Sequence, residues 1–168
     1  MLVKVFGAAV QGIDAFVITI EVSTSRGIKF FLVGLPDVAV RESHERIVSA
    51  LQVNGYKFPT SQIIVNMAPA DIRKEGAAYD LPLAVGIMTG AEIIKPNHLT
   101  EYIIMGELSL DGGLQPIKGA LSMAIKAKEA GFKGVILPYQ NAAEAAVVDG
   151  IEVYGVKNLR QVVSLLND

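Results

Sequence analysis

The stretch IIVNMAPADIRKEGAAYDLPLA, residues 63–84, decides the fold class of this chain. It begins with an apolar run, Ile63 to Met67, that indicates a buried strand. A polar, turn-prone segment follows from Ala68 to Tyr79, and Asp80 is predicted to cap a helix that runs to about Glu92. A strand that leads through a polar loop into a helix is typical of a sheet with helices packed against it.

The sequence on either side of this stretch continues the same organisation. Residues 1–33 predict a group of strands, because apolar and polar residues alternate from Phe16 to Val22. Residues 38–54 predict an amphipathic helix with Asp37 as its N-cap. Further expected elements are a strand at 102–108, a helix at 118–130, a strand at 135–137, a short helix at 141–147, a strand at 151–156 and a helix at 159–166. The fold class is therefore α/β or α+β, with a mixed sheet.

Composition predicts one soluble, folded domain over residues 1–168. Hydrophobic residues make up 51% of the chain and charged residues 19%, which excludes a disordered protein. The net charge of -2 does not indicate strong nucleic-acid binding. No apolar run approaches the roughly 20 residues of a membrane helix. The chain has no cysteine, which excludes thiol chemistry, and without an export signal the expected location is the cytoplasm.

The residue patterns also exclude common kinds of site. Neither G-x-x-x-x-G-K-[ST] nor G-x-G-x-x-G occurs, and the two histidines have no partners at zinc-binding spacing. Capping by Asp80 and turn formation by Asp111 explain two acidic residues without a metal, so no metal site is predicted. The other acidic residues near the 68–79 loop are Asp71, Glu75 and Glu107. The 68–79 loop itself is expected to form a functional surface.

Three motifs together resemble the N-terminal domain of the ComM/YifB family of magnesium-chelatase-like AAA+ proteins. They are VGLPDVAVRES (33–43), NMAPADIRKEG (66–76) followed by YDLPLA (79–84), and GELSLDG (106–112). The resemblance covers the whole chain. The motif residues are Pro36, Asp37, Arg41, Glu42, Pro69, Asp71, Lys74, Glu75, Gly76, Asp80, Gly106, Glu107, Asp111 and Gly112.

The resemblance implies a fold and a role. The implied fold is the ribosomal protein S5 domain 2-like fold, similar to the C-terminal domain of Lon protease. In the family, this domain precedes an AAA+ ATPase module that is not in this chain and that would need ATP and Mg²⁺. The resemblance implies a hexamer that drives DNA branch migration during recombination and natural transformation, with no membrane partner.

The Lon likeness raises the question of a serine–lysine protease. By resemblance, the serine position is Ala78 and the lysine position is close to Leu121. Ala77 does not supply a hydroxyl either, and Lys118, three residues early, is expected to face elsewhere on its helix. Neither half of the dyad is therefore present, and this chain is predicted to have no catalytic residues and no cofactor of its own.

Positive residues are the candidates for contact with DNA phosphates, because Lys and Arg position proteins on a nucleic-acid backbone. They are Arg73, Lys74, Arg41 and Arg46. Family members often carry a serine and a basic residue where this chain has Ala77 and Ala78, which weakens a phosphate-binding role for the loop. Arg41 and Arg46 also fit a simple solvated helix face. Two other functions stay open: a hydrolase that pairs Ser43 or Ser109 with Lys118, and a protein-interaction module.

Overall fold

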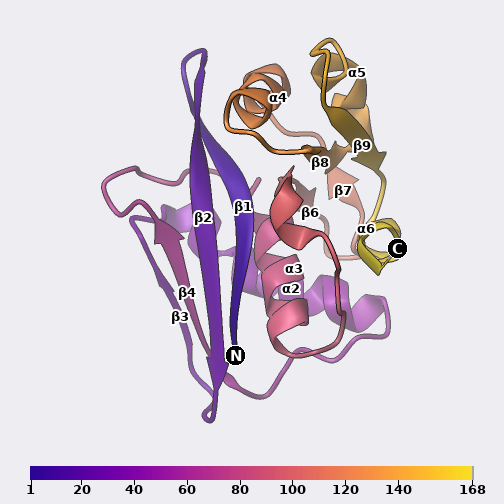
Figure 1. Cartoon of the computed structure of the whole chain (residues 1–168). Coiled ribbons are helices and arrows are strands. Elements are labelled where there is room, and N and C mark those ends of the chain that lie inside the picture. The colour runs from indigo at the N-terminus through magenta and orange to yellow at the C-terminus, as the bar shows by residue number, and fades with distance from the viewer. Residues whose placement is uncertain (168) are drawn as a thin grey trace.

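A seven-stranded mixed sheet forms the centre of the protein in a computed structural model that describes residues 1–167 (Figure 1). Its strand order is β3-β4-β2-β1-β5-β8-β9, and β6 and β7 form a separate two-stranded sheet. The strands are β1 (Leu2–Gln11), β2 (Asp14–Ser25), β3 (Phe30–Val33), β4 (Gln62–Ala68), β5 (Tyr102–Ile104), β6 (Glu107–Leu108), β7 (Leu114–Gln115), β8 (Gly134–Pro138) and β9 (Glu152–Val156). The predicted α/β class with a mixed sheet is confirmed.

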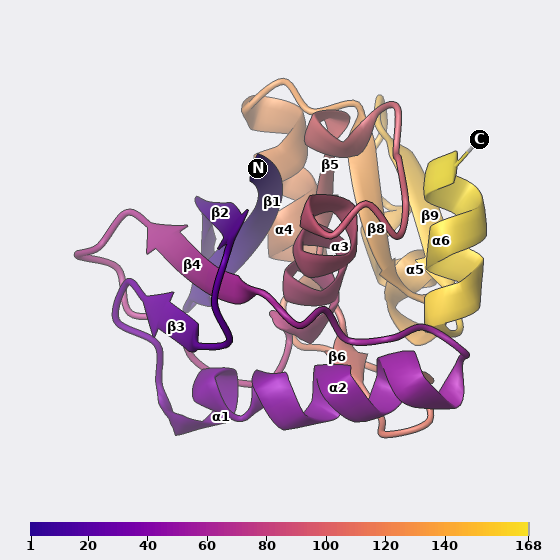
Figure 2. The ribbon, with the colours of Figure 1, turned by 90° about the horizontal axis from the view of Figure 1, so that it is seen from below.

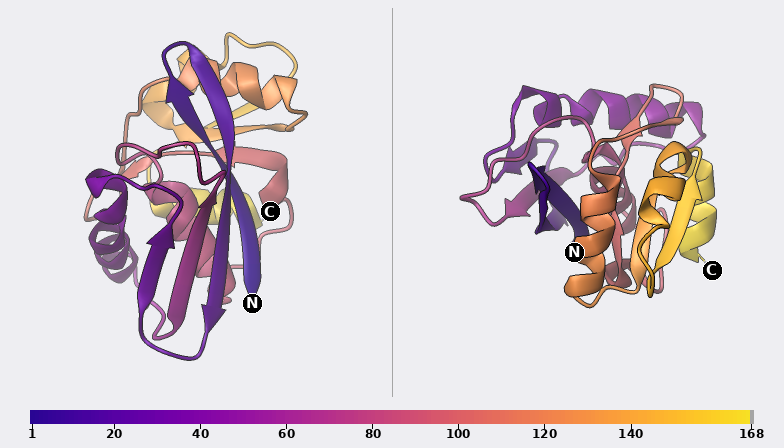
Figure 3. Two further views of the ribbon diagram at one scale, coloured as in Figure 1. Left: turned by 90° about the vertical axis from the view of Figure 1, so that its left-hand side faces the viewer. Right: turned by 90° about the horizontal axis from the view of Figure 1, so that it is seen from above.

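The sheet is mixed: β2 lies antiparallel to its two neighbours, and every other pair in the sheet is parallel. β2 pairs antiparallel with both β1 and β4, whereas β3–β4, β1–β5, β5–β8 and β8–β9 are parallel pairs. The alternation along β2 buries Ile18, Ile20 and Val22 completely. The turn at Gly12 carries the β1–β2 hairpin toward α4, where the Ser122 hydroxyl donates to the Ile13 carbonyl at 2.9 Å (Figure 3).

Helices cover both faces of this sheet. They are α1 (Val38–Arg41), α2 (Ser43–Val53), α3 (Asp80–Gly90), α4 (Ala120–Glu129), α5 (Ala142–Ala145) and α6 (Leu159–Asn167), with 3₁₀ turns at Leu99–Glu101 and Tyr139–Asn141. α1 and α2 run in a row outside α3, and α6 lies beside β9 (Figure 2). No helix within residues 1–167 is long and apolar enough to cross a membrane.

Close packing places α3 directly on the β1–β2 hairpin. A Cβ atom on Gly86 would lie 2.7 Å from Cγ2 of Val22, and one on Gly90 would lie 3.0 Å from Cγ2 of Thr24. The first distance is shorter than real Cβ contacts and the second is at the tight end of them, so the two glycines let this helix pack against the sheet. The second half of α3 therefore lies close against β2.

Two of the predicted elements are divided in the structure. The predicted 38–54 helix begins as expected, with Oδ1 of Asp37 accepting the N–H of Val40 at 2.8 Å, but it is interrupted at Glu42. The predicted 102–108 strand leaves the sheet after Ile104. There the N–H of Gly106 donates to the Ala78 carbonyl at 2.8 Å, so this part of the chain packs on the residues before α3 instead of continuing the strand.

Candidate functional site

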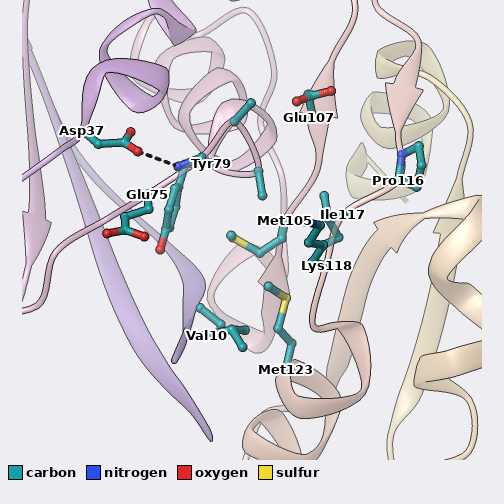
Figure 4. Close-up of a pocket in the computed structure, with 14 residues that line it drawn as sticks. Val10, Asp37, Glu75, Tyr79, Met105, Glu107, Pro116, Ile117, Lys118 and Met123 are labelled. Atoms are coloured by element: carbon teal, nitrogen blue, oxygen red, sulfur yellow. Dashed lines mark hydrogen bonds between the residues drawn. The ribbon is translucent and has the colours of Figure 1, made fainter. Parts of the chain in front are cut away.

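A cleft of about 580 Å³ lies between the loop that precedes α3 and the segment that precedes α4 (Figure 4). Ala8 and Val10 of β1 contribute to its wall. Glu75 and Tyr79 stand on one side, with Lys118 and Glu107 on the other (Figure 4). The volume is in the range of small-ligand pockets.

Lys74 holds the loop that forms one wall of this cleft. Its side chain is fully buried, and its ammonium group donates to the carbonyl of Gly34 at 2.7 Å and to the carbonyl of Pro69. Burial lowers the pKa of Lys74. The backbone N–H of Lys74 also donates to Leu35, and its carbonyl accepts from Asp37. The prediction that Lys74 contacts DNA is therefore wrong, because its ammonium group is used inside the protein.

Asp37 connects the same loop to the start of α1. One carboxylate oxygen accepts the N–H of Val40, and the other accepts the N–H of Gly76 at 3.1 Å (Figure 4). Both oxygens of this motif residue thus bind backbone groups. The loop conformation is fixed by Asp37 and Lys74 together, which explains why a long polar connection can form one wall of the cleft.

Asp80 forms a buried ion pair with Arg46 behind the cleft. Nε of Arg46 lies 2.7 Å from Oδ2 of Asp80, and Nη2 lies 2.9 Å from Oδ1. The N–H of Leu108 donates to the same carboxylate, and Arg46 also donates to the Ala39 carbonyl. Burial raises the pKa of Asp80, although these hydrogen bonds act against it, and the carboxylate raises the pKa of Arg46.

This ion pair corrects two predictions. Tyr79, and not Asp80, occupies the N-cap position of α3, and the Asp80 side chain makes no capping hydrogen bond. Arg46 is neither a solvated residue nor a free cation for DNA, because Asp80 binds it from 34 positions away. The sequence does not indicate this pairing, because Arg46 and Asp80 lie far apart along the chain and the i,i+4 spacing of Glu42 and Arg46 favours a local partner.

The other positive candidates remain on the surface. Arg41 is exposed at the end of α1, and Arg73 is 63% exposed with its Nε atom 3.2 Å from Glu75. Residues 1–167 contain no group of three or more side chains arranged to hold a metal ion. Asp111 accepts the N–H of Gly113 at 2.9 Å, as a turn residue does.

The cleft also contains the position that resemblance assigned to a catalytic serine. Ala77 and Ala78 line it, whereas Leu121 is 38% exposed on α4 outside its wall. Lys118 lines the cleft, contrary to the expectation that it faces elsewhere. The reason is that α4 begins only at Ala120, so Lys118 precedes the helix.

Neither alternative serine is placed to act with Lys118. Ser43 is completely buried and has no hydrogen-bond partner among the described residues. The Ser109 hydroxyl accepts a hydrogen bond from Gln115 at 2.7 Å. Neither serine belongs to the lining of the cleft. The structure therefore does not bring a serine hydroxyl close to Lys118, as a serine–lysine hydrolase requires.

Sequence reasoning missed Tyr79 as a cleft residue. Its side chain is only 2% exposed and its ring stands in the wall beside Glu75 (Figure 4). Burial, together with the charges of Asp37 and Glu75, raises the pKa of Tyr79 well above its usual value. The only available signal was an aromatic residue directly before a predicted helix, which does not distinguish a cleft residue from a core residue.

Comparison with known proteins agrees with this architecture. The family profile described as subunit ChlI of Mg-chelatase matches residues 20–141. Competence protein ComM of Haemophilus influenzae is 39% identical over 167 residues, covering 99% of this chain and 33% of the relative. The YifB protein of Escherichia coli K12 is 40% identical over 143 residues, covering 84% of this chain and 28% of the relative.

A more distant relative agrees with the fold. Lon protease 2 of Bacillus subtilis is 32% identical over 121 residues, covering 71% of this chain and 21% of the relative. This chain spans about a third of the length of the ComM protein that it matches. It therefore belongs to the Mg-chelatase ChlI family and matches an N-terminal domain of the ComM/YifB proteins.

Proposed function

We propose that this chain is the non-catalytic N-terminal module of a magnesium-chelatase-like AAA+ ATPase. The observation that carries the proposal is that Ala78, at the position that resemblance assigns to the protease serine, lines the cleft together with its neighbour Ala77. A methyl group offers no nucleophile, so the module would bind and position rather than cleave. The relative's name, competence protein, supports a role in natural transformation. The wider role proposed is hexamer assembly and DNA engagement in ATP-driven branch migration.

ATP and Mg²⁺ would be held by a further module of the whole protein. The sequence of this chain has no phosphate-binding loop of the common types. Among residues 1–167, no cluster of acidic or imidazole side chains is arranged to coordinate Mg²⁺. The remaining two thirds of the relatives' length is enough for an ATPase module.

The exposed edge of the sheet supports a role in assembly. β3 is an edge strand, and its side chains Phe31 and Val33 are 44% and 47% exposed. Ile64, which is paired with Phe31 on β4, extends this apolar surface. Exposed apolar strand edges favour association between chains. We place the contact between copies of the proposed hexamer here.

Arg41 and Arg73 are the proposed phosphate contacts. Replacing both with alanine in the full-length protein is expected to weaken binding to branched DNA about tenfold at moderate salt, because two phosphate contacts are lost. The slope of log affinity against log salt should decrease by about 2. Fluorescence anisotropy over a salt series measures both quantities.

The matched control removes two charges elsewhere. Lys126 and Lys128 lie on α4, and their double alanine variant should bind DNA nearly as well as the unchanged protein. Unaltered DNA affinity in the Arg41→Ala, Arg73→Ala variant would count against the proposed contacts. So would equal losses in the two double variants, since that result indicates only a general charge effect.

A further inference from the structure

The turn between β2 and β3 presents an apolar side chain between two cations. Ile28 is 88% exposed, and Arg26 and Lys29 on either side of it are exposed as well. Neither cation forms a salt bridge with a residue in the 1–167 range. The turn leads directly into β3, where the exposed Phe31 belongs to the apolar surface proposed for assembly. The turn therefore continues that surface and gives it a positive border.

A groove of about 220 Å³ lies at the other end of β2, between the β1–β2 hairpin and α4. Its apolar lining includes Ile13, Phe16 and Ile125. Ile13 is 88% exposed and Ile125 is 43% exposed. The hydrogen bond from Ser122 to the Ile13 carbonyl joins the hairpin to α4 beside the groove. The centre of the groove is therefore apolar and accessible to another molecule.

The charges around this groove are opposite to those of the turn. Asp14 and Glu129 line the groove, are exposed, and form no salt bridge with a described residue. Lys126 also lines the groove, so its net charge is negative by one, whereas the turn carries two positive charges. Opposite charges beside two apolar surfaces attract and orient these surfaces. The turn and the groove are thus complementary in both apolar character and charge.

The turn and the groove cannot meet within one molecule. β2 runs from Asp14, at the groove, to Ser25, at the turn, and its 12 residues span roughly 35 Å. Figure 1 shows the β1–β2 hairpin and α4 at one end of β2, and the turn into β3 at the other. Complementary surfaces on different parts of a chain produce a head-to-tail contact, which continues from one copy to the next. A ring of more than two equivalent copies requires a contact of this kind.

We propose that the β2–β3 turn of one copy inserts Ile28 into the groove between the hairpin and α4 of the next copy. The two cations of the turn then lie beside the carboxylates of Asp14 and Glu129 in the receiving copy. This inference rests on the proposed assembly into a ring, and it names the surface that receives the β3 side of each neighbour. A second copy is the partner because the same chain carries both the apolar turn and the groove of opposite charge.

Cysteine crosslinking in the full-length protein tests the direction of this contact. Residues 1–168 contain no cysteine, and any cysteine elsewhere in the protein is replaced with serine. The protein with both Ile28→Cys and Ile125→Cys, treated with a short bismaleimide, should form a ladder of linked copies. Each single variant should form at least about fivefold less linked product, because position 28 of one copy meets position 125 of the next. Mass photometry measures the size of the unlinked assembly in parallel.

Charge reversal assigns the polar contacts. In the double-cysteine protein, adding Arg26→Glu with Lys29→Glu should reduce the linked product about five- to tenfold, because like charges then face each other. Adding Asp14→Lys with Glu129→Lys to that protein should restore the product. Val53→Asp, at the exposed end of α2, is the control and should leave the yield unchanged. Labelling with a monofunctional maleimide corrects for any change in thiol reactivity.

The possible failures have different meanings. Equal linked product from a single-cysteine variant and the double-cysteine protein would overturn the head-to-tail contact, and so would a charge reversal that has no effect. A full-sized assembly that gives no ladder would overturn this contact but leave the proposed hexamer in place. A protein that stays monomeric with ATP and Mg²⁺ would overturn both the contact and the proposed assembly.

Discussion

Replacing Asp80 with alanine is expected to lower the free energy of unfolding by about 3–5 kcal/mol. The carboxylate is buried and holds both the Arg46 guanidinium and the N–H of Leu108. Without it, a mostly buried positive charge and a buried N–H group lose their partners, which is among the most destabilising changes a core can undergo. The loss should be large although no apolar contact is removed.

Urea unfolding followed by circular dichroism measures this effect. Asp149→Ala, at an exposed residue between α5 and β9, is the matched control and should change the free energy of unfolding by less than about 0.5 kcal/mol. The double variant with Arg46→Ala should lose less than the sum of the two single variants, because the unpaired charge is absent. Breaking a buried ion pair typically costs roughly 3–5 kcal/mol. If the free energy of unfolding of the Asp80→Ala variant lies within about 1 kcal/mol of that of the unchanged chain, the result contradicts a stabilising ion pair.

Replacing Lys74 with methionine is expected to cost about 2–3 kcal/mol of stability and to loosen the cleft loop. Methionine fills a similar volume, but the carbonyls of Gly34 and Pro69 lose their donor. Hydrogen exchange should become faster at residues 76–79, where the loop forms the cleft wall. Lys118→Met is the control, since that lysine is exposed and its loss should leave the stability nearly unchanged.

The effect of Lys74 should also depend on pH. Burial lowers the pKa of Lys74 below its ordinary value of 10.5, so the unfolded chain binds more protons than the folded chain between these two pKa values. The contribution of this residue to stability therefore increases as pH rises through that window. The methionine variant should lack the increase. Parallel stability curves for the two proteins would contradict a buried, titrating Lys74.

The local elements of the fold could be predicted because their signals are local. Alternating burial along β2 follows the apolar pattern from Phe16 to Val22, and Asp37 caps α1 as its position indicates. The division of the predicted 102–108 strand could not be read in the same way. It depends on Gly106 binding to Ala78, a contact between segments that are distant in sequence.

The candidate site was predictable only in part for the same reason. Resemblance assigned the serine position to Ala78, and in the structure this alanine lines a cleft. The roles of Lys74 and Arg46 were misread, because residue type alone does not distinguish a surface cation from one that binds carbonyls or a carboxylate inside the protein. The sequence does not indicate that β1 lacks a pairing partner on its β5 side beyond Phe6, since this depends on the short length of β5.

The most direct test of the central claim is labelling of the full-length protein with a serine-directed acylating probe, in the presence of ATP and casein. Lon protease 2 of Bacillus subtilis serves as the positive control. The alanines at positions 77 and 78 predict no covalent adduct on this domain and no casein cleavage. An adduct that maps to residues 1–168, together with ATP-dependent cleavage of casein, would contradict a non-catalytic module.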